Sequence, residues 1–162
     1  MDKAMSIQLY DVLDVVGRRF QEVFSQLFGG GTAQIVLTDP DNILTGGIDF
    51  YIQPPGKKRQ QLTLLSGGER ALTVIALLFS FLDYRPAPFC VLDEVDAALD
   101  EANVERFSSY LNRVNKETQF IVVSHRKKTM EAAEVLQGVT MVERGVSRLL
   151  TVAFEDVKED LA

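Results

Sequence analysis

Leu65-Ser66-Gly67-Gly68-Glu69 opens the stretch of sequence that decides the fold of this chain, and an apolar segment over residues 71–82 follows it. Two adjacent glycines cost about 1 kcal/mol each inside a helix but suit its first turn. Unpaired backbone N–H groups and the positive end of the helix dipole attract an anion there. Ser66 can donate a hydroxyl hydrogen bond, and glycines let a phosphate approach the backbone. The stretch therefore predicts a phosphate-binding helix start.

A short strand that ends in two carboxylates follows this helix. The helix over 71–82 is apolar on nearly every face, which predicts burial. Phe89 to Leu92 is typical of a central strand in a covered parallel sheet. Open α/β sheets bind ligands at the carboxyl ends of their strands, so we expect Asp93 and Glu94 at a binding edge. Asp93 is expected to hold Mg²⁺, directly or through its water, and Glu94 to polarise the attacking water.

The order of these motifs closely resembles the C-terminal half of the ATPase head of SMC chromosome-organising proteins, which are ABC-type ATPases. The resemblance covers roughly residues 20 to 155. The matching segments are Leu65–Glu69 for the signature motif, Phe89–Glu94 for Walker B, Val95–Asp100 for the D-loop and His125 for the switch histidine. The phrase from Cys90 to Val104 resembles bacterial SMC in particular, and ABC transporters more often carry Gln at position 69.

The resemblance implies an α/β lobe in which ATP and Mg²⁺ lie between two heads. The lobe is expected to have a mainly parallel sheet with helices and a small antiparallel edge sheet. One head is then expected to supply Walker A, Asp93 for Mg²⁺, Glu94 as general base and His125 at the γ-phosphate. The opposing head supplies Ser66, Gly67, Gly68 and Glu69 of the signature motif, with Asp100 of the D-loop. ATP binding would join the heads, and hydrolysis would release them during chromosome condensation and segregation.

A Walker A motif is absent from the 162 residues. Gly29–Thr32 has no lysine, and Gly56-Lys57-Lys58 has Lys58 where a magnesium-binding hydroxyl belongs. In SMC proteins this motif lies in an N-terminal half, separated by a very long coiled coil. We therefore expect a half-head that is inactive alone. Its expected partners are the N-terminal half of the same head, a second head and, in the complete protein, DNA.

The last two predicted strands suggest a further partner. Val139–Val142 and Arg148–Val152 flank a turn, and the adjacent Leu149 and Leu150 place an apolar side chain on each face of the second strand. The resemblance implies that the C-terminal winged-helix domain of a kleisin subunit binds this half of the head. The competing interpretation places both leucines in the core.

The remaining patterns divide the chain into two parts. Apolar spacing predicts a helix over 7–28, and we interpret residues 1–28 as the end of a coiled coil entering a head formed by 29–162. Within the first part, residues 1 to about 6 do not fit the helical pattern well and are expected to derive from a truncation junction. The other predicted elements are antiparallel strands 33–37 and 48–52, helix 103–115, strand 118–123 before Ser124-His125, helix 129–135, and a tail 155–162 that is helical or frayed.

Composition excludes several classes of protein. With 46% hydrophobic residues the chain can form one domain with a core, and its net charge of −6 argues against coating nucleic acid by bulk charge. The basic runs Lys57–Arg59 and Arg126–Lys128 are more typical of solvated surface. One Cys and one His exclude a zinc site, and the lone Cys90 fits a reducing cytosol. Without a signal peptide or membrane span in the sequence, we expect a cytoplasmic, nucleoid-associated protein.

Other functions remain open at this point. The chain could belong to another chromosomal ABC ATPase of RecN-like or break-repair type, or to the nucleotide-binding domain of a transporter. The length of the chain and the residues of its motifs disfavour the transporter. A non-enzymatic alternative is that the chain acts only as a binding module.

Overall fold

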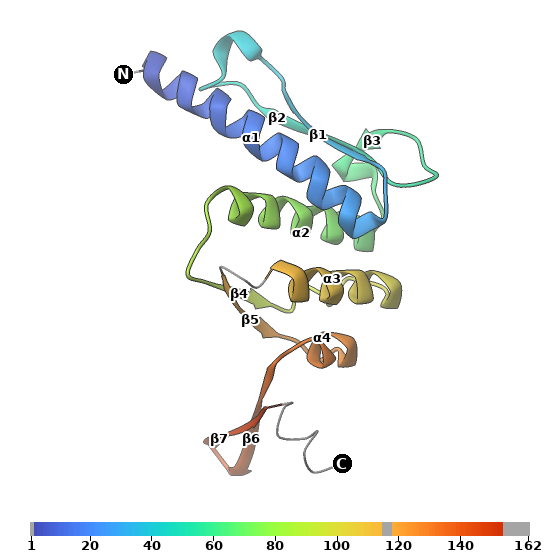
Figure 1. Cartoon of the computed structure of the whole chain (residues 1–162), viewed down its shortest axis with the longest axis vertical. Helices are drawn as coiled ribbons and strands as arrows, with labels where there is room; N and C mark the ends of the chain where they lie inside the picture. Colours follow the sequence, from blue (N-terminus) through green and yellow to red (C-terminus); the bar gives the residue numbers. More distant parts are fainter. Residues whose placement is uncertain (1, 115–117, 154–162) are drawn as a thin grey trace.

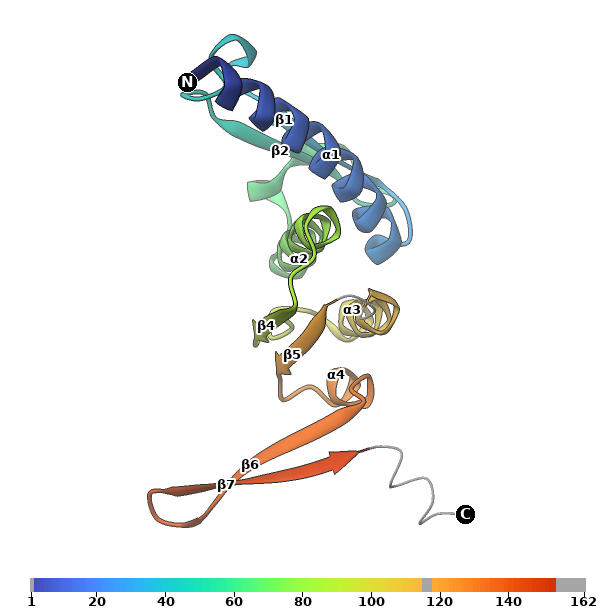
Figure 2. The same cartoon turned by 60° about the vertical axis from the view of Figure 1, so that its left-hand side comes forward.

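A computed structural model describes residues 2–114 and 118–153 of the chain. Its elements follow one another along a single long axis, from the N-terminal helix with its sheet to a C-terminal hairpin at the other end (Figures 1 and 2). Within the described residues, no helix is both long and apolar enough to cross a bilayer. The expectations for Asn115 and for the tail 155–162 lie outside the described residues.

Helix α1 (Asp2–Phe28) buries one apolar stripe that includes Phe20, Phe24 and Leu27. The prediction started this helix at Ile7, but no helix breaker precedes that residue and the helix begins at Asp2. Three glycines with positive φ end it. At Gly31 a Cβ would lie 2.3 Å from the Gln53 carbonyl oxygen, so only glycine fits this turn.

Helix α1 lies along an antiparallel sheet, as Figure 1 shows. The sheet has the order β1 (Thr32–Leu37), β2 (Ile48–Gln53) and β3 (Gln60–Gln61). The first two strands confirm the predicted pair, whereas β3 was not predicted because two polar residues carry no strand pattern. Two short 3-10 helices, η1 (Pro40–Asn42) and η2 (Leu62–Leu64), lie in the connections.

The core lies where α1, α2 (Gly67–Tyr84) and α3 (Glu101–Val114) meet. Phe79 of α2 is its aromatic centre, with ring centroids 6.3 Å from Phe107, 5.0 Å from Tyr110 and 5.7 Å from Phe120. The prediction that α2 is buried all round is wrong for this chain. Val74 and Phe81 are exposed, because the described part of the chain covers only one side of the helix.

Strands β4 (Phe89–Asp93) and β5 (Gln119–Val123) pair in parallel, with α3 as the crossover between them. They are the only parallel pair among the described strands, so this part of the sheet is two strands wide. The prediction of a covered strand is wrong for the chain alone. One face of the pair is open, with Phe89 57%, Val91 54%, Ile121 47% and Val123 50% exposed.

The C-terminal elements are α4 (Lys127–Glu131) and a hairpin of β6 (Val135–Glu143) and β7 (Val146–Ala153). The helix predicted over 129–135 begins and ends earlier, because β-branched Val135 pairs with Ala153 as the first residue of β6. The strands are also longer than predicted. In Figure 2 the hairpin extends away from the helical core.

Candidate nucleotide-binding surface

The start of α2 is closed by a capping box. Ser66 is the N-cap, and its Oγ accepts from the backbone N–H of Glu69 at 3.4 Å. In return Glu69 Oε2 accepts from the Ser66 backbone N–H at 3.2 Å and from Ser66 Oγ at 2.8 Å. Ser66 itself remains exposed. The sequence predicted the helix start, but it did not indicate that the Ser66 hydroxyl would be engaged by its own helix.

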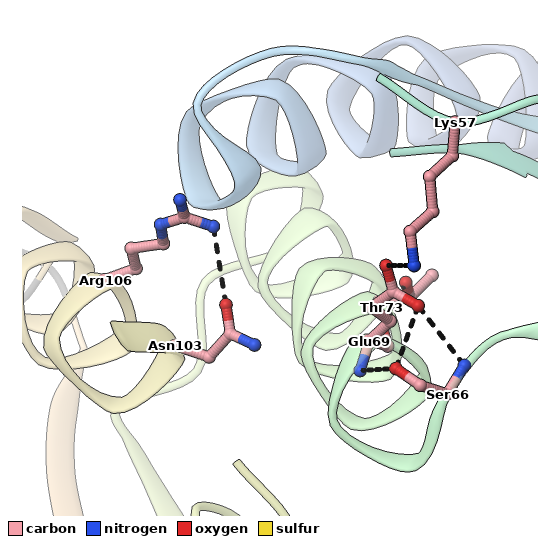
Figure 3. A network of polar contacts seen from close by, with 6 residues as sticks. All are labelled: Lys57, Ser66, Glu69, Thr73, Asn103 and Arg106. Carbon is pink, nitrogen blue, oxygen red and sulfur yellow. Dashed lines mark hydrogen bonds and ion pairs between the residues drawn. The ribbon is translucent and has the colours of Figure 1, made fainter. Parts of the chain in front are cut away.

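Lys57 completes this network from the loop between β2 and β3 (Figure 3). Its Nζ lies 2.8 Å from Glu69 Oε1, and only 16% of the Glu69 side chain is exposed. Burial alone would raise the pKa of Glu69, but the hydrogen bonds from Lys57 and Ser66 outweigh it and hold that pKa below its ordinary value. Glu69 is therefore kept as a carboxylate. Sequence reasoning missed Lys57, because a lysine in a basic loop has the pattern of a solvated residue.

The two glycines at this helix start have different surroundings. A Cβ at Gly68 would lie 3.3 Å from the Ala98 carbonyl oxygen, so close packing accounts for glycine there. A Cβ at Gly67 would meet nothing within 4 Å. Gly67 is also exposed and has no positive φ. The fold of the chain alone therefore gives no reason for glycine at position 67, whereas a ligand approaching the backbone would.

The end of β4 brings together three of the predicted site residues. Asp93 is the last residue of β4 and pairs with Val123, so Glu94 and His125 emerge at the same edge of the sheet. Asp93, Glu94 and His125 are all exposed. Glu94 has a left-handed backbone with φ 48°, and its N–H donates to the Val123 carbonyl oxygen at 2.9 Å. Such a backbone in a non-glycine residue is uncommon and is a feature of functional sites.

No group of three or more His, Cys, Asp or Glu in the described residues could hold a metal ion. Asp93 can nevertheless serve Mg²⁺ in the way usual for nucleotide sites, where one or two carboxylates act together with phosphate oxygens and water. The residues present therefore fit Mg²⁺ that arrives with a nucleotide.

Residues 95–100 follow the end of β4 and pack against the start of α2, and we call them the connecting segment. At its end, the Asp100 carboxylate caps α3 by accepting from the Asn103 N–H at 2.9 Å. Asp96 is fully buried and accepts a hydrogen bond from Ser124 Oγ at 2.6 Å. Arg126 donates to the Leu99 carbonyl oxygen at 2.9 Å. Sequence reasoning missed Asp96 and Arg126, since nothing in their spacing distinguishes them from surface charges.

Comparison with known proteins places the chain in a family. Residues 18–148 match the RecF/RecN/SMC N terminal domain. The chain is 58% identical over 159 residues to the chromosome partition protein Smc of Bacillus subtilis (strain 168), which covers 98% of this chain. It is 54% identical over 160 residues, or 99% of this chain, to Smc of Desulfitobacterium hafniense (strain Y51). The chain spans only 13% of the length of each of these relatives.

Solved structures show the same fold. The Smc head domain from Pyrococcus furiosus, bound to the C-terminal domain of ScpA, superposes with a TM-score of 0.87 at 35% identity, over 98% of this chain and 40% of that one. A chain from work on ATP-driven dimerization of SMC ATPases gives a TM-score of 0.85 at 35% identity, over 96% of this chain and 94% of that one. The SMC head domain from Thermotoga maritima gives 0.70 at 42% identity, over 92% and 51% of the two chains.

Proposed function

The chain belongs to the SMC family and is a fragment of an SMC ATPase head, and from this premise we propose that it forms the C-terminal half of a composite ATP site between two heads. In the complete protein, ATP binding would join the heads and hydrolysis would release them, coupling the cycle to chromosome partition and to DNA held by the protein. The similarity to proteins named Smc favours this role over a RecN-like or transporter function.

The observation that carries the proposal is the open backbone at Gly67. Nothing in the fold requires glycine there, and the capping box leaves the helix start exposed to a ligand. An anion at this position is favoured by the free N–H groups and by the helix dipole. The site is one-sided, because the chain has no Walker A lysine to surround the β- and γ-phosphates. A second surface must therefore supply the rest of the nucleotide contacts.

The residues at the β4 edge would act on ATP held by their own head. Glu94 would take a proton from the water that attacks the γ-phosphate, and His125 would contact that phosphate. Asp93 would hold Mg²⁺, which neutralises phosphate charge when it is bound. Across the interface, Ser66, Gly67 and Gly68 of the opposing head would contact the γ-phosphate. Glu69 would keep its Ser66 in place, and Asp100 would face the partner site.

The open face of β4 and β5 fits the missing N-terminal half of the same head. Its apolar side chains Phe89, Val91, Ile121 and Val123 are about half exposed, and a large exposed apolar patch marks an interaction surface. The edge of this sheet also carries Asp93 and Glu94, so a segment packed here would bring Walker A close to them. This arrangement would complete one head from two separate segments of one protein.

Calorimetry with Mg-ATP tests the half-site. We expect no tight binding to this chain alone and restored binding when the N-terminal half is added. Submicromolar binding by the chain alone would overturn the proposal. The matched control is the combined head with Phe89→Asp, which should lose the partner half and nucleotide binding together.

The hairpin of β6 and β7 is the proposed kleisin surface. Leu149 is 67% and Leu150 59% exposed, so the competing interpretation that both leucines belong to the core is wrong. Solved relatives include an Smc head bound to the C-terminal domain of ScpA and an SmcHead bound to the C-winged helix domain of ScpA. We extend that kind of contact to this hairpin.

A pull-down with a kleisin C-terminal domain tests this surface. Leu149→Asp and Leu150→Asp should each weaken capture without unfolding the chain, since neither side chain is buried. Leu64→Asp is the matched control, because Leu64 is as exposed as Leu149 but lies on η2. Failure of the unmodified chain to capture the domain would contradict the partner. Capture that survives both hairpin substitutions would contradict the location.

Two further assignments follow from the same proposal. Residues 1–28 would be the end of the coiled coil, with 29–162 forming the half-head. Met5, Ile7 and Tyr10 are exposed near the start of α1, where a second coiled-coil helix would cover them. We also propose a cytoplasmic location at the nucleoid, where a protein of chromosome partition would act.

A further inference from the structure

The connecting segment is held by a buried acid that the proposed reaction does not use. Asp96 is fully buried, and its Oδ2 accepts from Ser124 Oγ and Thr129 Oγ1. Ser124 lies just before His125, and Thr129 lies in α4. Through Asp96, the turn that carries His125 is therefore bonded to the segment that carries Asp100.

Arg126 makes a second connection between the same two parts of the chain. Its Nη2 donates to the carbonyl oxygens of Ala97 at 3.3 Å and Leu99 at 2.9 Å, and its backbone N–H donates to Ser124 Oγ at 2.9 Å. Hydrogen bonds from a charged donor are stronger than neutral ones. One side chain in the His125 turn thus holds two backbone carbonyls of the connecting segment.

The same segment touches the start of α2. The Ala98 carbonyl oxygen lies 3.3 Å, and the Asp100 backbone nitrogen 3.9 Å, from the position of a Cβ on Gly68. His125, Asp100 and Gly68 would contact nucleotide or the partner head under the proposed function. Asp100 belongs to the connecting segment, Gly68 packs against it, and His125 lies between two residues that are hydrogen-bonded to it. A displacement of the segment would therefore alter both sides of the head interface.

The connection also has unused hydrogen-bonding capacity. Asp96 Oδ1 and Arg126 Nε are buried and make no hydrogen bond within the part of the chain that the structure describes. Buried polar groups are usually paired, so a rearrangement of the segment that engaged these two atoms would gain hydrogen bonds that the present arrangement lacks. An element with two arrangements is what coupling between two sites requires.

We propose that Arg126 is a positioning residue that makes the His125 turn and the connecting segment move together. Contact of His125 with nucleotide in one head would thereby set the position of Asp100 toward the opposing head. This inference rests on the proposed function, since it assigns a task to a residue that touches neither nucleotide nor partner.

The test uses ATP hydrolysis by the full-length protein with Arg126→Ala. We expect kcat to fall about tenfold while KM changes little, because the substitution disturbs positioning and leaves nucleotide binding intact. Arg126→Lys should recover part of the rate, since one ammonium group can still donate to a carbonyl oxygen. Lys127→Ala is the matched control, because Lys127 is the next cation along the chain and forms an ion pair with the exposed Glu131 at the surface. It should leave the rate unchanged.

A double-mutant comparison separates coupling from simple loss of structure. Asp100→Ala should lower kcat in the unmodified protein and lower it little further in the Arg126→Ala protein, because the coupling is already lost. If the two substitutions lower kcat independently, so that their fold-effects multiply in the double variant, the inference is overturned. A kcat of Arg126→Ala equal to that of the unmodified protein would also overturn it. If Arg126→Ala does not fold, the same comparison with Arg126→Met decides by the same criterion, because methionine keeps an apolar stem but cannot donate to the two carbonyl oxygens.

Glu94→Gln, measured in parallel, distinguishes this inference from the proposed function. If Glu94→Gln still hydrolyses ATP at the normal rate, the proposed function fails. If Glu94→Gln is inactive but Arg126→Ala hydrolyses normally, only the positioning role of Arg126 fails.

Discussion

Replacement of Gly67 by alanine should stabilise the fold and abolish the function. The Cβ of an alanine at this position would meet nothing within 4 Å, and Gly67 has no positive φ. A Gly→Ala change at a compatible position stabilises by about 0.5–1 kcal/mol, chiefly by restricting the unfolded chain. For a chain of this size that gain raises Tm by about 1–4 °C.

The expected loss of function comes from the same methyl group. A phosphate oxygen hydrogen-bonded to the helix start lies about 3 Å from a backbone nitrogen, in the space that the new side chain would enter. Gly68→Ala is the matched comparison. Its Cβ would lie 3.3 Å from the Ala98 carbonyl oxygen, which must move by a few tenths of an ångström. We expect no gain in stability there, and a loss of up to about 1 kcal/mol.

Urea denaturation of the chain measures the stability, and sedimentation of the full-length protein with ATP measures head pairing. The reasoning predicts that Gly67→Ala is more stable than the unmodified chain and fails to pair. A destabilised Gly67→Ala chain would refute the packing argument. A stabilised variant that still pairs normally would refute the assignment of Gly67 to the phosphate.

Three further predictions follow from the described contacts. Glu94→Gln in the full-length protein should keep ATP binding and head pairing in sedimentation but lose at least about 100-fold in hydrolysis rate, since an amide cannot accept the proton from water; normal turnover would contradict its role as base. Phe107→Ala should cost the chain about 3–5 kcal/mol in urea denaturation, because Phe107 is fully buried against Phe79, and a cost below about 1 kcal/mol would contradict this packing. Glu69 has a lowered pKa, so its contribution to stability is present above the ordinary value of 4.5 and is lost as pH falls through the folded value. In Lys57→Met, the free energy of unfolding measured by denaturation should therefore fall less on acidification than in the unmodified chain. An unchanged dependence of stability on pH would contradict the ion pair.

Local patterns were sufficient to predict most elements of the fold. The apolar stripe of α1, the alternation around Phe50 and the glycines before α2 each depend on nearby residues, and the structure has all three elements. Predictions failed where the outcome depended on what covers a surface. Phe89 and Val91 look like interior residues of a sheet, but the described chain leaves their face open.

The candidate site was predicted where it follows from strand and helix ends. Asp93, Glu94 and His125 lie at one sheet edge because β4 and β5 are parallel. The supporting residues could not be predicted, because their partners are distant in sequence. Arg126 reaches the carbonyl oxygen of Leu99, and Lys57 reaches from the loop before β3 to Glu69 in α2. Only three-dimensional contacts distinguish these cations from solvated ones.

Mixing two inactive variants tests most directly whether the site is shared between heads. Glu94→Gln and Ser66→Arg should each abolish hydrolysis in the full-length protein, the second by filling the helix start that docks on the partner's γ-phosphate. In a mixed pair, the intact Glu94 of one head faces the intact Ser66 of the other, so one of the two sites is complete. Equal mixing makes half of the pairs mixed, and hydrolysis should recover to about one quarter of the normal rate. A mixture as inactive as either variant alone would contradict a site built from two heads.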